Sequence, residues 1–151
     1  MFSLFFSGKT TFLNSLSVRA PYAHIFGSVE LVETIPNSTE LLHRPMTKED
    51  LYYVPQFDNL NPSFTVYQTL CLAFQLNNRQ NIRSCSEKVE EIVSILELKK
   101  RLRTKVSDLS MGERKRLSCG VGLIASPAIL MLDEPSSALD SQASTILLHY
   151  L

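Results

Sequence analysis

The spacing of apolar positions changes several times along the 151 residues, and each change predicts a new element. Apolar residues recur at helical spacing between Lys9 and Leu16, which predicts a helix that ends before Pro21. Apolar residues then alternate with small or polar ones over 27–32, and this period of two predicts a strand. A second short strand is predicted over 51–55.

Helical spacing dominates the middle of the chain, where it begins at Thr65 and continues to Phe74. Two later helices each begin with a Ser-x-x-Glu capping box, in which the two side chains satisfy free backbone N–H groups of the first turn. The two boxes are Ser84 with Glu87 and Ser110 with Glu113. This third of the chain is therefore predicted to be helical.

The helix that begins at Ser110 is expected to run to about Ala125, and Pro127 separates it from an apolar strand. That strand spans 129–132 and ends in two adjacent acids. A helix and short strands precede the helical middle of the chain, and a buried strand follows it. This order predicts a doubly wound α/β core that is interrupted by a helical subdomain.

Composition supports one globular domain, because 44% of the residues are hydrophobic and the length is that of a single domain. We assign residues 1–60 and 126–151 to the α/β core and residues 61–125 to the helical subdomain. Fifteen basic and fifteen acidic residues cancel, so no overall field draws the chain to nucleic acid or to anionic lipid.

Cysteine usage and hydropathy restrict the compartment. Three cysteines without a Cys-x-x-Cys spacing predict reduced core thiols in a cytosolic protein and no structural zinc. The apolar, charge-free stretch 117–132 falls short of the roughly 20 apolar residues that a membrane span needs. We therefore expect these residues to be soluble.

Candidate chemistry begins with the run Ser7-Gly8-Lys9-Thr10-Thr11 at the start of the first predicted helix. In a phosphate-binding loop, backbone N–H groups and a lysine hold the phosphates, and a hydroxyl binds Mg²⁺. Lys9 and Thr10 fit these two roles. Gly-Lys-Thr alone is a weak signal, and Ser3 and Phe6 stand where glycines are usual.

Asp133 and Glu134, at the end of the last predicted strand, are more specific. A buried strand rarely ends in adjacent acids unless a cation or a substrate offsets their desolvation. Asp133 is then a Mg²⁺ ligand through water, and Glu134 polarises the attacking water, a general-base role worth roughly 10²- to 10⁴-fold in rate. The alternative is two solvated acids in a turn before Pro135.

The remaining candidates each have a structural and a functional interpretation. Ser110 and Gly112 belong to a helix start that the capping box alone explains, although the same helix N-terminus is also an anion site. Gln56 follows a strand and is either a loop amide or a site residue. Asp140 caps a helix under either interpretation and is the weaker candidate.

In this order the blocks resemble the ATP-binding cassette, or ABC, ATPases. The blocks are Ser7-Gly8-Lys9-Thr10-Thr11, Tyr53-Val54-Pro55-Gln56, Leu109-Ser110-Met111-Gly112-Glu113, Ile129-Leu130-Met131-Leu132-Asp133-Glu134-Pro135 and Ser137-Ala138-Leu139-Asp140. Phe64-Thr65-Val66-Tyr67-Gln68-Thr69-Leu70 and Gly112-Glu113-Arg114-Lys115-Arg116-Leu117-Ser118 are similar to the G subfamily, the white-like half-transporters. Met111 departs from the pattern, because the signature sequence usually has glycine there.

The resemblance implies a P-loop NTPase (RecA-like) core with a parallel sheet, an ABC-type helical subdomain, and ATPase activity with ATP and Mg²⁺ as cofactors. It implies catalytic roles for Glu134 and Gln56, and Mg²⁺ contacts from Thr10, Gln56 and Asp133. The implied nucleotide contacts are Ser7, Gly8, Lys9, Thr10 and Thr11 of one cassette and Ser110, Gly112 and Asp140 in a head-to-tail dimer with a second cassette.

The resemblance also implies a transmembrane domain as partner, in the same or another chain, at the cytoplasmic face of a membrane. Such transporters export lipids or other hydrophobic substrates, and no nucleic acid is expected. Ser3, Phe6 and Met111 leave an alternative, a catalytically inactive cassette that binds nucleotide or a partner. We expect the cassette to be incomplete at both ends, and these residues alone to hydrolyse ATP weakly or not at all.

Overall fold

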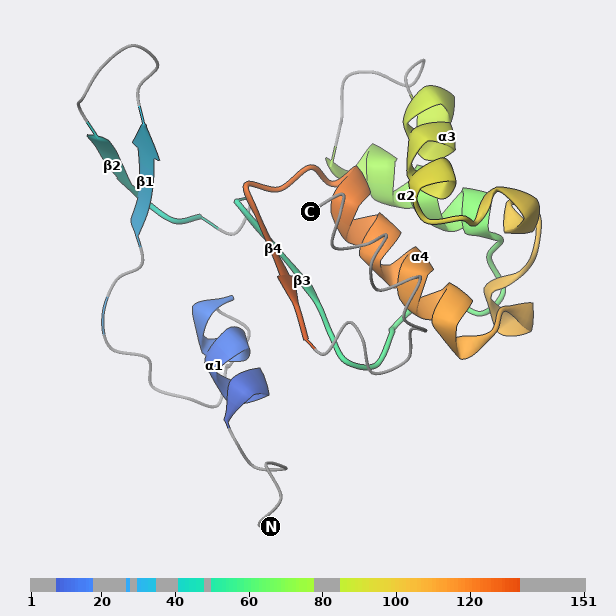
Figure 1. The fold of residues 1–151 in the computed structure, drawn as a ribbon, viewed down its shortest axis with the longest axis horizontal. Coiled ribbons are helices and arrows are strands. Elements are labelled where there is room, and N and C mark those ends of the chain that lie inside the picture. Colours follow the sequence, from blue (N-terminus) through green and yellow to red (C-terminus); the bar gives the residue numbers. More distant parts are fainter. Residues whose placement is uncertain are drawn as a thin grey trace.

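The computed structural model describes residues 8–17, 27, 30–34, 41–47, 50–77 and 85–133. Its elements, in chain order, are α1 (Lys9–Leu16), β1 (Glu30–Thr34), β2 (Leu41–Pro45), β3 (Leu51–Val54), α2 (Val66–Asn77), α3 (Cys85–Ile95), the 3₁₀ helices η3 (Lys99–Arg101) and η4 (Val106–Asp108), α4 (Met111–Ile124) and β4 (Ile129–Leu132). Figure 1 shows α2, α3 and α4 packed together beside the β3–β4 pair, with the β1–β2 hairpin standing apart.

The helices lie where the sequence predicts them, and the capping box of α4 is confirmed. Ser110 Oγ accepts from the Glu113 N–H at 3.2 Å, and Glu113 Oε2 accepts from the Ser110 N–H at 2.8 Å. Arg101 Nε also donates to Glu113 at 2.7 Å. The Ser110 N–H and the Arg101 guanidinium hold the pKa of Glu113 below its ordinary value. Ser84, the predicted cap of α3, lies outside the described residues.

The strands agree with the sequence at the core and differ at the hairpin. β3 and β4 pair in parallel, which confirms the predicted parallel sheet. β1 begins later than the predicted strand at 27–32, and β2, its antiparallel partner, was not predicted. β2 reads Leu-Leu-His-Arg-Pro, so it lacks the period-two alternation by which a strand is recognised.

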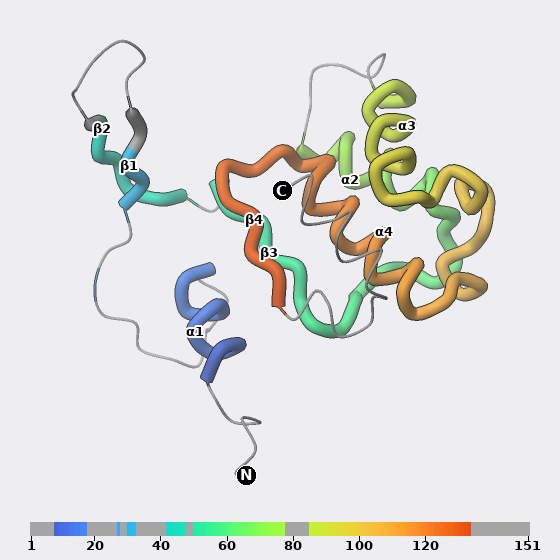
Figure 2. The backbone as a smooth tube through the Cα atoms, in the orientation of Figure 1, coloured from blue at the N-terminus to red at the C-terminus, as the bar shows by residue number. Residues whose placement is uncertain are grey.

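The hydrophobic core lies where α4 packs against α2, α3 and the sheet. Figure 2 shows the backbone of α4 running between the other two helices and the β3–β4 pair. Fully buried residues here include Val54, Leu70, Leu117 and Ile124 from these elements and Leu96, which directly follows α3. The two glycines in the second half of α4 permit close packing on both faces of the helix. A Cβ on Gly120 would lie 2.7 Å from Leu96 Cδ1, and one on Gly122 would lie 2.7 Å from Leu130 Cδ1.

All three cysteines are free thiols. Cys85 Sγ contacts Cys71 Sγ at 3.0 Å, between α3 and α2. Burial raises the pKa of Cys85 and of Cys119 to about 11 each, because it disfavours the charged thiolate. Cys85 and Cys119 therefore belong to the helical core and lack the thiolate character that a reactive cysteine needs.

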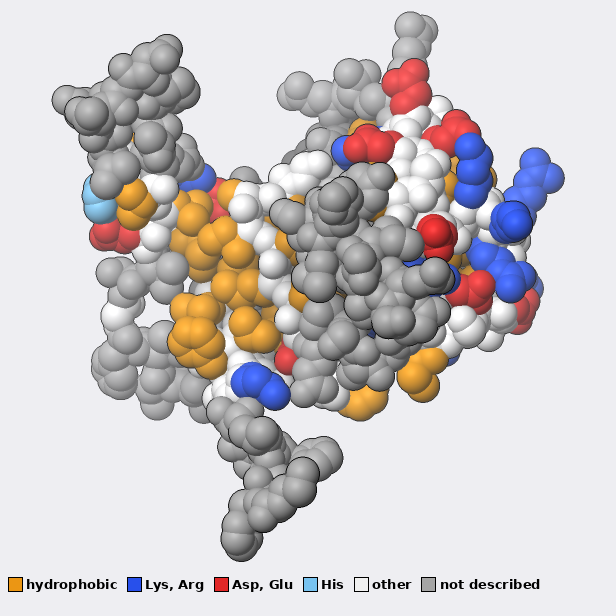
Figure 3. Space-filling view, viewed as in Figure 1, with side chains coloured by type: hydrophobic (Ala, Val, Ile, Leu, Met, Phe, Trp, Pro, Cys, Tyr) orange, Lys and Arg blue, Asp and Glu red, His pale blue; other side chains and the backbone are white. Residues whose placement is uncertain are grey.

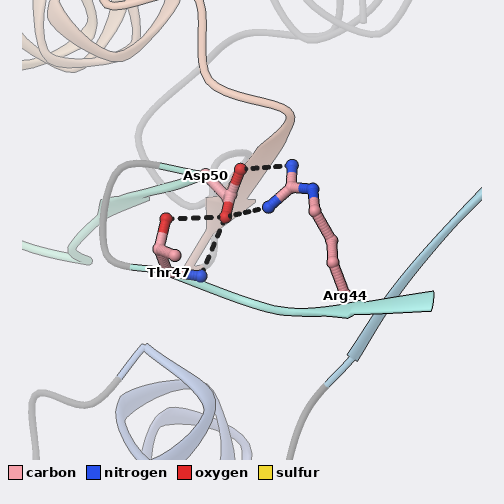
Figure 4. Close-up of polar contacts among 3 residues, drawn as sticks. All are labelled: Arg44, Thr47 and Asp50. Atoms are coloured by element: carbon pink, nitrogen blue, oxygen red, sulfur yellow. Dashed lines mark hydrogen bonds and ion pairs between the residues drawn. The ribbon is translucent and has the colours of Figure 1, made fainter. Parts of the chain in front are cut away.

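A polar cluster fixes the start of β3 (Figure 4). The Arg44 guanidinium donates to both carboxylate oxygens of Asp50 at 2.7 Å, and Thr47 donates to the same carboxylate from its N–H and its hydroxyl. The Asp50 carbonyl in turn accepts from the Ile129 N–H at 2.8 Å. The cluster thus connects the end of β2 to the first residues of the parallel pair.

The Asp50 cluster predicts a stability contribution that depends on pH. The hydrogen bonds from Arg44 and then Thr47 hold the pKa of Asp50 well below its ordinary value of 3.8. Because the folded pKa is depressed, the contribution is present above about pH 4 and is lost as the pH falls through the folded pKa. We expect Asp50→Asn to lower the urea midpoint at neutral pH, and the difference from wild type to narrow steadily as the pH falls from about 4 to 2.

A matched control removes one carboxylate charge elsewhere. Glu97 is exposed, so Glu97→Gln is expected to leave the urea midpoint unchanged at both pH values. An Asp50→Asn difference that stays constant from neutral to acid pH would show that the Arg44–Asp50 pair is not its cause.

Candidate functional site

The carboxyl ends of β3 and β4 bring two predicted site residues to one edge of the sheet. Val54 lies opposite Leu132 in the parallel register, and the Asp133 N–H donates to the Val54 carbonyl at 3.0 Å. Asp133 therefore directly follows one strand, and Gln56 lies two residues beyond the other. In an open α/β sheet, this edge is where ligands bind.

Asp133 is the most deeply buried acid among the described residues, with 2% of its surface exposed. Tyr53 donates its hydroxyl to Asp133 Oδ2 at 3.0 Å, and it reaches the carboxylate from within β3. A buried carboxylate needs such partners, because its desolvation is otherwise uncompensated. The burial of Asp133 does not fit the alternative in which this acid is solvated in a turn.

Lys115 is a site residue that sequence analysis missed. It lies in α4 and is only 3% exposed. Its Nζ donates to the carbonyls of Pro55 at 2.8 Å, Gln56 at 3.2 Å and Asp133 at 3.3 Å. The available signal was helical spacing, because Lys115 precedes the buried Cys119 and Gly122 by four and seven residues and so shares their face.

The predicted phosphate loop is described from Gly8 onward, and Ser7 lies outside the described residues. Gly8 is the N-cap of α1 and has φ of 72°, a left-handed conformation that favours glycine because it has no Cβ. Lys9, Thr10 and Thr11 follow in the first turn and are exposed. First-turn N–H groups lack intrahelical acceptors, which suits this turn to a bound anion.

Ser110 and Gly112 lie at the N-terminus of α4. Ser110 is exposed, and Met111 between them is 75% exposed. This turn can therefore reach a second molecule. Glu134 and Asp140 lie outside the described residues, and the juxtaposition of Lys9 with Asp133 stays a prediction.

The described donor set fits Mg²⁺. A buried carboxylate at Asp133, an exposed amide at Gln56 and an exposed hydroxyl at Thr10 are the hard oxygen ligands that Mg²⁺ prefers. Within the described ranges, no three His, Cys, Asp or Glu side chains cluster. A nucleotide-bound Mg²⁺ does not require such a cluster, because phosphates and waters complete a shell that holds one or two carboxylates.

Among the helices of the described ranges, none combines the length and the apolar character that crossing a bilayer requires. Charged side chains gather around α3 and the turns after it, whereas many hydrophobic ones gather where α1 and the neighbouring β3–β4 pair lie (Figure 3).

Comparison with solved structures supports the fold. The chain is similar to the ATP-binding cassette MJ0796 in a dimeric post-hydrolysis state bound to ADP and Pi, with a TM-score of 0.62 and 24% identity. The match covers 68% of this chain and 46% of that one. At this identity the likeness shows the fold alone, and it confirms the predicted P-loop NTPase core.

Sequence comparison identifies the family. The chain is 35% identical to ABC transporter G family member 5 of Oryza sativa subsp. japonica and to member 19 of Arabidopsis thaliana, over 91% and 89% of its length. It is also 35% identical to member 15 of Dictyostelium discoideum, over 96% of its length. The chain spans only 18%, 19% and 10% of these three relatives. The predicted resemblance to the G subfamily is confirmed. Because the family profile described as ABC transporter matches residues 7–137, the chain belongs to the ABC transporter family.

Proposed function

We propose that the chain is the ATP-binding and ATP-hydrolysing cassette of a G-type ABC transporter, which powers export of a lipid or another hydrophobic substrate. The observation that carries the proposal is the buried Asp133 beside Gln56 at the carboxyl edge of a parallel sheet. The cassette comprises core residues 1–60 and 126–151 and helical-subdomain residues 61–125.

In the proposed site, the turn of Gly8 and the first N–H groups of α1 surround the phosphates, and Lys9 neutralises their charge. Ser7 and Thr11 extend this contact. Thr10, Gln56 and Asp133 hold Mg²⁺, which supplies positive charge beside the terminal phosphate when it is bound. Glu134 orients the attacking water and accepts its proton.

The proposed partner is a second cassette in a head-to-tail dimer. Ser110 and Gly112 present the exposed N-terminus of α4 to the phosphates held by that cassette, and Asp140 completes the contact. The dimeric arrangement of the cassette MJ0796 supports this assignment. ATP would then be closed between two chains, and ADP and phosphate would be released after its hydrolysis.

The proposed site of action is the cytoplasmic face of a membrane, through a transmembrane domain in the same or another chain. Phe57, next to Gln56, is 79% exposed, and Leu76 on α2 is 70% exposed. Large apolar side chains at such exposure suit a surface that another protein covers. The proposal places the contact at Phe57 beside the nucleotide site, so that nucleotide binding and the membrane domain are coupled through Gln56.

A catalytically inactive cassette that binds nucleotide or a partner is the second candidate. It is favoured by Met111, which is 75% exposed at the position where the signature sequence usually has glycine. A bulky side chain there hinders close approach of a phosphate to the first turn of α4. The two candidates differ in hydrolysis and agree in nucleotide binding.

Isothermal titration with Mg-ATP tests the proposed site. We expect Lys9→Ala to weaken binding at least about tenfold, because a charged hydrogen bond contributes roughly 1.5–3 kcal/mol. Mg²⁺ should raise the affinity for ATP above the affinity measured in EDTA, and we expect Asp133→Asn to remove most of this gain. Lys100→Ala, at an exposed lysine of η3, should bind as the wild type does. Equal binding by wild type and Lys9→Ala, or no binding by wild type, would refute the proposal.

A further inference from the structure

The early turns of α4 are tied to the segment after β3 and to the end of β4. Lys115 contacts both, because its ammonium lies within hydrogen-bond distance of the Pro55, Gln56 and Asp133 carbonyls. Its neighbour Arg114 donates to Asp58 Oδ1 at 3.2 Å. α4 therefore makes three of these hydrogen bonds to the segment after β3 and one to the end of β4.

The three contacts of Lys115 use its whole donor capacity. An ammonium has three N–H bonds, and three backbone carbonyls from two different strand ends receive them. Desolvating a lysine is costly unless such partners compensate it. With 3% exposure and three hydrogen bonds, the Lys115 side chain is held in one defined position.

We propose that Lys115 is a positioning residue that fixes Gln56 and Asp133 relative to each other and to the N-terminus of α4. This inference rests on the proposed function, in which Gln56 and Asp133 hold Mg²⁺ for the cassette's own nucleotide. Lys115 acts through the backbone carbonyls of these two residues and touches neither the nucleotide nor the metal.

The position of Lys115 also connects two nucleotide sites of the proposed dimer. Ser110 and Gly112 cover the nucleotide of the partner cassette, and Lys115 follows Gly112 by less than one helical turn. A displacement of Gln56 or Asp133 at the cassette's own site therefore moves α4, and with it the contact to the partner's nucleotide. All three N–H groups of the Lys115 ammonium are hydrogen-bonded to the strand ends. Such a lysine transmits a displacement of these ends to its helix more directly than a solvated lysine would.

Amide hydrogen exchange tests the positioning role without nucleotide. The Asp133 N–H bonds to Val54 at the end of the β3–β4 ladder that Lys115 contacts, and the Ile129 N–H bonds to Asp50 at the other end. We expect Lys115→Met to speed exchange at Asp133 at least about tenfold, because charged hydrogen bonds at that end are lost. Exchange at Ile129 should change by less than about twofold.

Two further variants serve as controls. Lys100→Met removes an exposed lysine and should change exchange at neither amide. Lys115→Gln keeps N–H donors without the charge and should fall between wild type and Lys115→Met; if the methionine variant does not fold, the glutamine variant carries the same comparison. Equal acceleration at Asp133 and Ile129 would mean general destabilisation, and unchanged exchange at Asp133 would mean no positioning role. Either result overturns the inference.

Nucleotide titration adds a readout that separates the two proposals. With ADP as the probe, we expect Lys115→Met to reduce the affinity gained from Mg²⁺ at least about fivefold and to leave the affinity in EDTA unchanged. An equal loss with and without Mg²⁺ would overturn the inference. If wild type binds no nucleotide, the proposed function fails, and the coupling of nucleotide sites fails with it. The amide exchange then decides the structural role of Lys115 alone.

Discussion

Glu134→Gln is expected to lower the rate of ATP hydrolysis by roughly 10²- to 10⁴-fold and to leave Mg-ATP binding intact, because the amide cannot accept a proton from water. Gln retains the size of Glu, so phosphate and metal contacts through Lys9 and Asp133 should persist. The measurement is phosphate release under single-turnover conditions, with the chain in excess over radiolabelled ATP. This arrangement detects slow hydrolysis, which is the activity expected of these residues alone.

Glu87→Gln is the matched control, because it makes the same change at an exposed position in the first turn of α3. It should hydrolyse ATP at the wild-type rate. Undiminished hydrolysis by Glu134→Gln would remove Glu134 from the mechanism. A wild type that holds Mg-ATP and releases no phosphate would instead favour the inactive, nucleotide-binding cassette.

The helices and the core strands could be predicted because their determinants are local. The capping box of Ser110 and Glu113 defines the start of α4 within four residues, and the structure contains both of its hydrogen bonds. β2 could not be predicted in the same way. Val32 and Leu42 are about half exposed, and none of the hairpin side chains that the structure describes is buried, so this described part has no buried face from which alternation could arise.

The sequence predicts those candidate site residues that come directly after an apolar strand. Asp133 was identified because an acid after an apolar strand is unusual, and its burial in the structure fits that argument. Lys115 was missed because its role depends on backbone carbonyls from two strands that are remote in sequence. Every residue has a backbone carbonyl whatever its side chain, so no sequence motif identifies the side chain that donates a hydrogen bond to a particular carbonyl.

Gly122→Val is expected to destabilise the fold by about 3 kcal/mol, because it overpacks the contact between α4 and the sheet. Even a single Cβ at this position would lie 2.7 Å from Leu130 Cδ1 and 3.0 Å from Tyr52 Cδ1. The Leu130 methyl can rotate away, but the Tyr52 ring is stiff, and valine adds two methyl groups beyond the Cβ. α4 must then move away from β3 and β4.

The free energy of unfolding, from urea titration followed by circular dichroism, measures this effect. Gln75→Val is the control, because it places valine at an exposed position of α2 and should change stability by no more than roughly 0.5 kcal/mol. Gly122→Ala should lose less than Gly122→Val, since alanine gains up to about 1 kcal/mol of helix propensity over glycine. Wild-type stability in Gly122→Val would contradict close packing of α4 on the sheet. Because the same packing brings Lys115 to the carbonyls of Gln56 and Asp133, Gly122→Val should also weaken the Mg²⁺-dependent part of nucleotide binding.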